Sequence, residues 1–341
     1  MININLENSF TTAGSSSAIA IDSGDNVWVI NAYLSTNALQ KFDNNGNLLG
    51  SFTTAGSSSA IAIDSADNIW ITNGTSTNDL QKFDNNGNLL GSFTTEARGD
   101  SLGLAIDSGD NVWIVFQIGL QQFNNAGNSI NVYSILSFAP ISGYQFQVGT
   151  TYLKGLAIDS DDNLYPCATA KLYGSSDYFL LKFNKNGQII NTLNVTALNL
   201  QASKHSSIKI NNNNLWYYTD ITSGNNFYLF NTELILQNSY FLQQTFDAGG
   251  MAIDSNDDVI VAAPTTNNNL FAAINENGYF LGTYFNSQNG SYTTYDIAID
   301  SNNSLFSTDF IGNLYKFNIQ DTKNLTSTFH LNAVNYCECE V

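Results

Sequence analysis

Short apolar segments alternate with polar turns along the whole chain, and the pattern repeats. Residues 9–50 and residues 51–91 carry nearly the same sequence. In the second copy, apolar or alternating segments cover residues 60–64, 68–72, 80–84 and 88–94. The turns between them read Asp-Ser-Ala-Asp-Asn and Asn-Asn-Gly-Asn, residue types that tolerate a positive φ. This pattern predicts four short antiparallel strands in each repeat and no helix.

The number of repeats follows from the phrase Ile-Ala-Ile-Asp and its close variants. Its aspartates are Asp22, Asp64, Asp107, Asp159, Asp254 and Asp300. A degenerate copy at residues 208–211 fills the one long gap, which makes seven marks. Four-stranded units repeated about a centre are the blades of a β-propeller. The sequence therefore predicts an all-β fold, a seven-bladed β-propeller of four-stranded antiparallel blades.

The tryptophans follow the same repeat. All four occupy one position in the second strand of their units: Trp28, Trp70, Trp113 and Trp216. A repeated apolar position normally faces the core. We therefore expect these rings to be wedges between neighbouring blades rather than a binding cage.

The two ends of the chain bear on how the ring closes. Residues 5–10 match residues 47–52, which form an outermost strand, so the N-terminal strand is predicted to complete the last blade. Residues 325–331 are also strand-like and compete for that edge. The predicted organisation is one propeller domain over residues 1–331 and a tail over residues 332–341. The tail holds Cys337 and Cys339, as free thiols or as a link to a partner chain.

Composition excludes some classes of partner. The chain has 11 Lys and Arg residues against 29 Asp and Glu residues, a formal net charge of −18. A basic patch for nucleic acid or an anionic membrane surface cannot be assembled from so few cations. No apolar run is long enough to span a bilayer, and the N-terminus does not read as a signal peptide. Location is left open between an extracellular or virion surface and the cytoplasm.

The repeated phrases also resemble a known family. Ile-Ala-Ile-Asp-Ser-x-Asp-Asn-Val-Trp-Val followed by Leu-Gln-Lys-Phe-Asp-Asn-Asn-Gly-Asn-Leu-Leu-Gly-Ser-Phe resembles the NHL repeat and is similar to propellers of the virginiamycin-lyase and gluconolactonase type. This resemblance implies the propeller fold. In the family, an Asn and an Arg after the second strand tie blades together, and this chain lacks the Arg. The RNA-binding function of some members needs a basic face and does not carry over.

Polar side chains near the strand ends are candidates for chemistry. The repeated aspartates are predicted to cap turns, because a catalytic pair needs two unlike environments. No metal or cofactor is predicted. The resemblance to lactonases adds an alternative, Ca²⁺ in the central channel, with ligands from Asn31, Asn73, Asp220 and Asp309. His205 with Asp220 is the alternative catalytic set, acting at the channel mouth.

Loop variation indicates which face of the ring carries function. The two near-constant turns of each unit face one side, whereas insertions of variable length face the other. The insertions are rich in aromatic and amide residues, which suit contacts to proteins or glycans, although solvated loops would read similarly. The candidate binding residues are Tyr33, Phe116, Tyr144, Phe146, Tyr173, Tyr178, Tyr292 and Tyr295.

These observations favour a non-enzymatic function. We expect a binding or structural propeller that engages a protein or glycan through its variable face, for example in adhesion or in a surface or virion assembly. The alternative is a metal-assisted lactonase or a lyase that acts at the mouth of the central channel.

Overall fold

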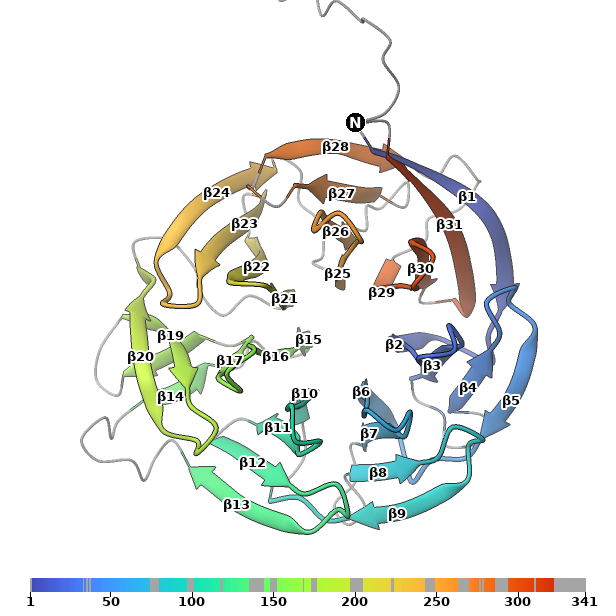
Figure 1. Cartoon of the computed structure of the whole chain (residues 1–341), viewed down its shortest axis with the longest axis horizontal. Coiled ribbons are helices and arrows are strands. Elements are labelled where there is room, and N and C mark those ends of the chain that lie inside the picture. The colour runs from blue at the N-terminus through green and yellow to red at the C-terminus, as the bar shows by residue number, and fades with distance from the viewer. Residues whose placement is uncertain are drawn as a thin grey trace, which may run out of the picture.

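The computed structural model arranges the chain as radial sheets around one axis (Figure 1). It describes residues 2–32, 34, 36, 38–73, 80–96, 101–116, 119–134, 144–147, 152–167, 169–172, 177–196, 205–221, 224–242, 249–262, 270–275, 277, 279–285, 294–309 and 311–321. Every regular element within these ranges is a β-strand. No α-helix in this part of the chain has the length and hydrophobicity to cross a bilayer.

Blades 1 to 3 follow the predicted pattern of four consecutive antiparallel strands. Blade 1 contains β2 (Ser16–Ile21), β3 (Val27–Asn31), β4 (Leu39–Phe42) and β5 (Leu48–Phe52). Blade 2 contains β6 (Ser58–Ile63), β7 (Ile69–Asn73), β8 (Leu80–Phe83) and β9 (Leu89–Phe93). Blade 3 contains β10 (Ser101–Ile106), β11 (Val112–Phe116), β12 (Gly119–Phe123) and β13 (Ser129–Ser134).

Blades 4 and 5 carry strands beyond the basic four. Blade 4 contains β16 (Leu156–Ile158), β17 (Leu164–Pro166), β19 (Tyr178–Phe183) and β20 (Ile189–Asn194), and it is extended by β14 (Tyr144–Gln147) and β18 (Thr169–Leu172). Blade 5 contains β21 (His205–Asn211), β22 (Asn214–Ile221), β23 (Gly224–Asn231) and β24 (Leu236–Leu242). A short strand β15 (Tyr152–Lys154) pairs in parallel with β21.

Blade 7 closes the ring as predicted. Blade 6 contains β25 (Met251–Ile253), β26 (Val259–Ala262), β27 (Leu270–Ile274) and β28 (Phe280–Phe285). Blade 7 contains β29 (Thr294–Ile299), β30 (Ser304–Asp309), β31 (Asn313–Asp321) and, as its outermost strand, β1 (Ile2–Thr11). Figure 1 shows β1 along the outside of β31. In the register of this pair, Leu6 lies opposite Phe317. The competing segment 325–331, the tail 332–341, Cys337 and Cys339 lie outside the described residues.

The core lies between the blades, as the repeated tryptophans predicted. Trp28 of blade 1 is fully buried and packs with Ile69 and Phe83 of blade 2. Its ring also stacks on Phe52, with the centroids 5.8 Å apart. Other apolar clusters likewise join side chains of two neighbouring blades. Each blade therefore gains its solvent protection from the blades beside it.

Candidate functional site

The repeated aspartates cap the first turn of their blades, as predicted. The Oδ1 atom of Asp22 accepts hydrogen bonds from the backbone N–H groups of Gly24 (3.0 Å) and Asn26 (2.9 Å). Its Oδ2 atom accepts the indole N–H of Trp28 at 3.1 Å. Blades 2 and 3 repeat this arrangement. We call the side of the ring with these turns the turn face and the opposite side the variable face.

In blades 1 and 2, a lysine extends the aspartate–tryptophan pair to the next blade. The ammonium of Lys41 lies 3.2 Å from Oδ2 of Asp22 and 4.9 Å from the ring centroid of Trp28. It donates to the backbone carbonyl of Asn85 in blade 2 at 2.9 Å, and the Asn85 amide donates back to Asp22 at 3.0 Å. Blade 2 makes the same arrangement toward blade 3. We call this Asp–Trp–Lys–Asn arrangement the interblade latch. It ties neighbouring blades together through side chains of both blades.

A second set of turn residues also joins neighbouring blades. The fourth turn residue has a positive φ, 60° at Asp25, and accepts hydrogen bonds from the turn of the preceding blade. Ser301 of blade 7 donates to Asp25 from its backbone N–H (2.9 Å) and its hydroxyl (2.7 Å), across the closure of the ring. The corresponding pairs are Ser23–Asp67, Ser65–Asp110, Ser108–Asp162 and Ser255–Asn303. The turn face thus uses its polar side chains to hold the ring.

The latch aspartates remain ionised at neutral pH. Burial alone would raise the pKa of Asp22, but hydrogen bonds from Asn26, Trp28 and Asn85 outweigh it and hold the pKa below its usual value. The pKa of Asp64 is lowered for the same reasons. A carboxylate that holds no proton at neutral pH cannot act as a general acid. These groups serve as acceptors and as counter-charges for the lysines.

Three of the four candidate Ca²⁺ ligands are buried and hold structural hydrogen bonds. The amide of Asn31 donates to Oε1 of Gln40 at 3.0 Å, and Asn73 donates to Gln81 at 3.1 Å. Asp309 accepts bonds from a turn of its own blade, including the backbone N–H two residues later at 3.0 Å. Across the described ranges, no three His, Cys, Asp or Glu side chains are grouped as metal ligands would be. These contacts give the three residues a structural role within their blades.

The alternative catalytic residues meet at the end of two neighbouring strands. His205 begins β21, the innermost of the four basic strands of blade 5, and Asp220 lies near the end of β22. Ser206 pairs with Thr219, so His205 and Asp220 lie one residue beyond the same pair. Their side chains lie outside the described part of the structure. The sequence analysis expected both residues at the channel mouth. The backbone brings the two positions together at neighbouring strand ends.

Blade 4 gathers several candidate binding residues on the variable face. Strand β18 continues the direction of β17 away from the turn face, and β14 pairs with it. Tyr144 lies opposite Leu172 and Phe146 lies opposite Ala170, while β19 places Tyr178 beside the same strand. Two aromatic residues of β14 thus lie in one sheet with Tyr178 at the start of β19.

The remaining candidate binding residues are scattered. Phe116 is only 3% exposed at the end of β11, so its ring belongs to the interior and is not available to a partner. Tyr295 lies near the start of β29, and its side chain lies outside the described part of the structure. Tyr33, Tyr173 and Tyr292 lie outside the described residues.

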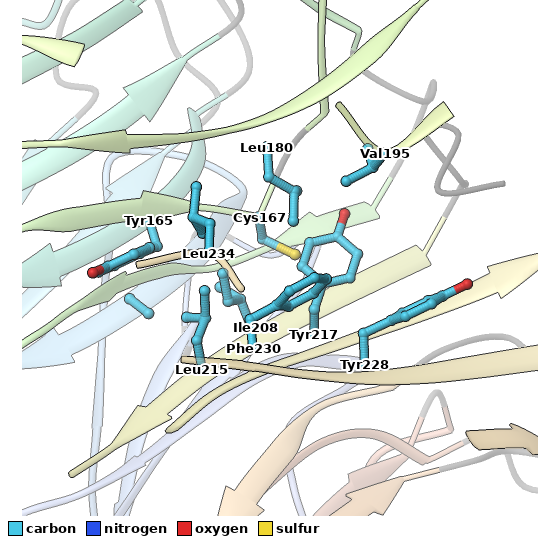
Figure 2. Packing of buried hydrophobic residues seen from close by; sticks show 11 residues of the cluster. Tyr165, Cys167, Leu180, Val195, Ile208, Leu215, Tyr217, Tyr228, Phe230 and Leu234 are labelled. Atoms are coloured by element: carbon cyan, nitrogen blue, oxygen red, sulfur yellow. The ribbon is translucent and has the colours of Figure 1, made fainter. Parts of the chain in front are cut away.

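Cys167 occupies the interface between blades 4 and 5. Figure 2 shows it beside Tyr217 in a cluster of apolar side chains. Burial raises the pKa of its thiol strongly, and a hydrogen bond with Tyr217 opposes this only in part. A protonated, buried thiol is a poor nucleophile. Cys167 is therefore a packing residue.

The comparisons with known proteins concern the fold. No family model matches the chain, and no curated protein sequence matches it. A streptogramin B lyase structure is similar, with a TM-score of 0.73 and 12% identity over 94% of this chain and 98% of that one. Virginiamycin B lyase from Staphylococcus aureus matches with a TM-score of 0.72 and 12% identity, over 93% of this chain and 99% of its own. The WD40 propeller domain of Doa1 matches with a TM-score of 0.66 and 11% identity, over 94% of this chain and 98% of its own.

These likenesses confirm the expected fold. The chain is a seven-bladed β-propeller similar in structure to virginiamycin B lyase and to propellers of other kinds. Propellers host unrelated activities, so similarity at this level of identity carries no activity with it.

Proposed function

We propose that this chain is a non-enzymatic binding or structural propeller that engages a protein or a glycan through its variable face. Such a module suits adhesion or the assembly of a cell surface or virion. The observation that carries the proposal is the structural difference between the turn face and the variable face. On the turn face, repeated side chains bond one blade to the next, whereas blade 4 extends beyond the repeat only on the variable face.

The composition of the extension supports a polar, aromatic binding surface. Tyr144, Phe146 and Tyr178 lie on strands of one sheet, and aromatic residues are the usual anchors of protein and glycan contacts. The four lysines in or near latches are held at blade interfaces, which leaves few cations for any anionic polymer. Nucleic acid is therefore not among the partners that we propose.

The double variant Tyr144→Ala with Tyr178→Ala tests this proposal. Wild-type protein is screened on a glycan array and against captured proteins, and each ligand found is then titrated. We expect the double variant to bind at least tenfold more weakly, because two anchors are removed. Tyr279→Ala is the matched control, since this tyrosine is 65% exposed beside a turn on the turn face. Equal binding by the double variant, or equal loss in the control, would refute the proposal.

A lyase or lactonase at the channel mouth is the second candidate. It is favoured by the adjacent backbone positions of His205 and Asp220 and by the likeness in fold to two lyases. His would serve as the general base in such a reaction. Turnover is measured on a panel of lactones and cyclic esters with wild type and with His205→Ala plus Asp220→Asn. Activity that the double variant retains in full would remove these residues from any catalytic role.

A further inference from the structure

Blade 6 lacks the interblade latch. Its turn aspartate, Asp254, occupies the place of Asp22 in blade 1. The asparagine that follows four residues later in blades 1 to 4 is Asp258 here. The tryptophan is replaced by Ile260 and the lysine by Ala273. Three groups that donate to the carboxylate in blade 1 are thus replaced together, and one of the replacements is a second carboxylate.

The backbone of the turn is nevertheless the same. Oδ1 of Asp254 accepts the N–H groups of Asn256 (2.8 Å) and Asp258 (2.9 Å), as Asp22 does in blade 1. Asp254 is 5% exposed and Asp258 is fully buried. Among the described residues, no donor reaches Oδ2 of Asp254. A buried carboxylate oxygen without a donor is costly, and blades 1 and 2 show which groups supply the donors at this place.

In blade 1 the same oxygen receives an indole N–H, an asparagine amide and the Lys41 ammonium at 3.2 Å. The side chain of Asn26 also lies directly against the carboxylate, with its amide nitrogen 2.9 and 3.0 Å from the two oxygens. Asp258 stands at that position in blade 6. Two carboxylates therefore replace an aspartate–amide pair, at a place where blade 1 holds a positive charge.

We propose that Asp254 and Asp258 bind a hard cation of the Ca²⁺ class, at the place that the lysine ammonium takes in blade 1. Two carboxylates balance a divalent charge, and oxygen-only ligands select hard cations. Ca²⁺ accepts backbone carbonyls and irregular geometry, whereas Mg²⁺ demands near-octahedral geometry and usually keeps several waters. The cation would take over the stabilising role of the latch in blade 6. This site is separate from the variable face and from the channel mouth.

The full-length protein, freed of metal with EDTA, is used for the test. With about 1 mM Ca²⁺ we expect the Tm of the wild type to rise by about 3 °C or more, and one ion to bind per chain by calorimetry. The variant Asp258→Asn restores the residue found in blades 1 to 4, so it is expected to fold. In this variant the rise in Tm with Ca²⁺ should disappear, while its Tm in EDTA should equal or exceed that of the wild type.

Asp67→Asn is the matched control, because it removes one charge from a turn where blade 7 has Asn303 naturally. It should keep the full response to Ca²⁺. The proposal is overturned if the wild type shows no rise in Tm, or if Asp258→Asn responds as the wild type does. It is also overturned if wild-type stability responds to acidification and not to Ca²⁺, since the two carboxylates would then share a proton instead.

Discussion

The interblade latch shows how much depends on single residues. Lys41 is a cation held between a carboxylate, an aromatic ring and a carbonyl of the next blade. Its partner Asp22 has a fully buried side chain. A buried ion pair is sensitive to the loss of one member, because the other charge stays behind without compensation. The latch therefore makes sharper predictions than a surface salt bridge would.

Lys41→Met should lower the free energy of unfolding by about 2–4 kcal/mol, since it leaves the Asp22 carboxylate buried without its cation. Urea unfolding at pH 7 measures the change. Lys185→Met is the control, because Lys185 is exposed on a turn. The free energy of unfolding of this variant should match that of the wild type. Equal stability of the two variants would show that the latch contributes nothing to folding.

Acid should weaken the latch in a defined direction. The folded-state pKa values of Asp22 and Asp64 lie below the unfolded values, so their contribution is present above the unfolded pKa of about 3.9 and is lost as the pH falls through the folded pKa. We expect wild-type stability to fall below about pH 4. The variant Asp22→Asn with Asp64→Asn should be less stable at pH 7, and its stability should fall less steeply as the pH is lowered. Parallel pH profiles of the two proteins would contradict this assignment.

Individual blades show which contacts their local sequence could predict. Each Asn-Asn-Gly-Asn turn places a glycine under a phenylalanine of the preceding blade. Gly87 has φ = 82°, and a Cβ atom there would lie 2.0 Å from the Phe52 ring. By contrast, Gly109 stands where blade 2 has Ala66, and its Cβ would meet only the Asn111 amide at 3.2 Å and the Asp107 carboxylate at 3.4 Å. Two glycines in similar turns thus have different reasons to be there.

Gly87→Ala should destabilise the protein by at least about 1 kcal/mol, because it combines a left-handed backbone with a steric clash. Gly109→Ala should change stability little or raise it slightly. Thermal unfolding of both variants provides the comparison. An Ala at position 87 that leaves Tm unchanged would mean that the Phe52 ring does not pack there.

The local sequence pattern predicted the strands well, but it predicted the contacts between residues of different blades poorly. The Ile-Ala-Ile-Asp strands, the aspartate caps and the tryptophan wedges follow from residues close in sequence or from the repeat itself. The partner of Lys41 is Asn85, one repeat away, so its role depends on how blades stack. The recurrence of lysine in the repeated phrase Leu-Gln-Lys-Phe was the sequence signal that could have indicated this contact. Strands β14, β15 and β18 have no template in the repeat. Strand β15 pairs with β21 of blade 5 and ends directly before Gly155, where φ is 136°.

The whole molecule depends on ring closure by its own first strand. The repeat predicted that residues 5–10 complete the last blade, and β1 pairs with β31 from Ile2 to Thr11. Side-chain contacts cross the same junction, among them those from Ser301 to Asp25 and from Lys316 to Asn44. The distinction between the turn face and the variable face holds only if this ring is closed. The candidate site, by contrast, was predicted only in part, because its loops follow no repeat.

A disulfide between Asn5→Cys and Asn318→Cys tests ring closure most directly, because these residues are paired in register between β1 and β31. The background carries Cys337→Ser and Cys339→Ser, and Asn5→Cys with Asn88→Cys in blade 2 is the control. We predict that oxidation joins the first pair within one molecule, giving a monomer of altered gel mobility, and leaves the control pair reduced. No intramolecular disulfide in the first pair, or disulfide-linked dimers in its place, would contradict a ring closed by β1 of the same chain.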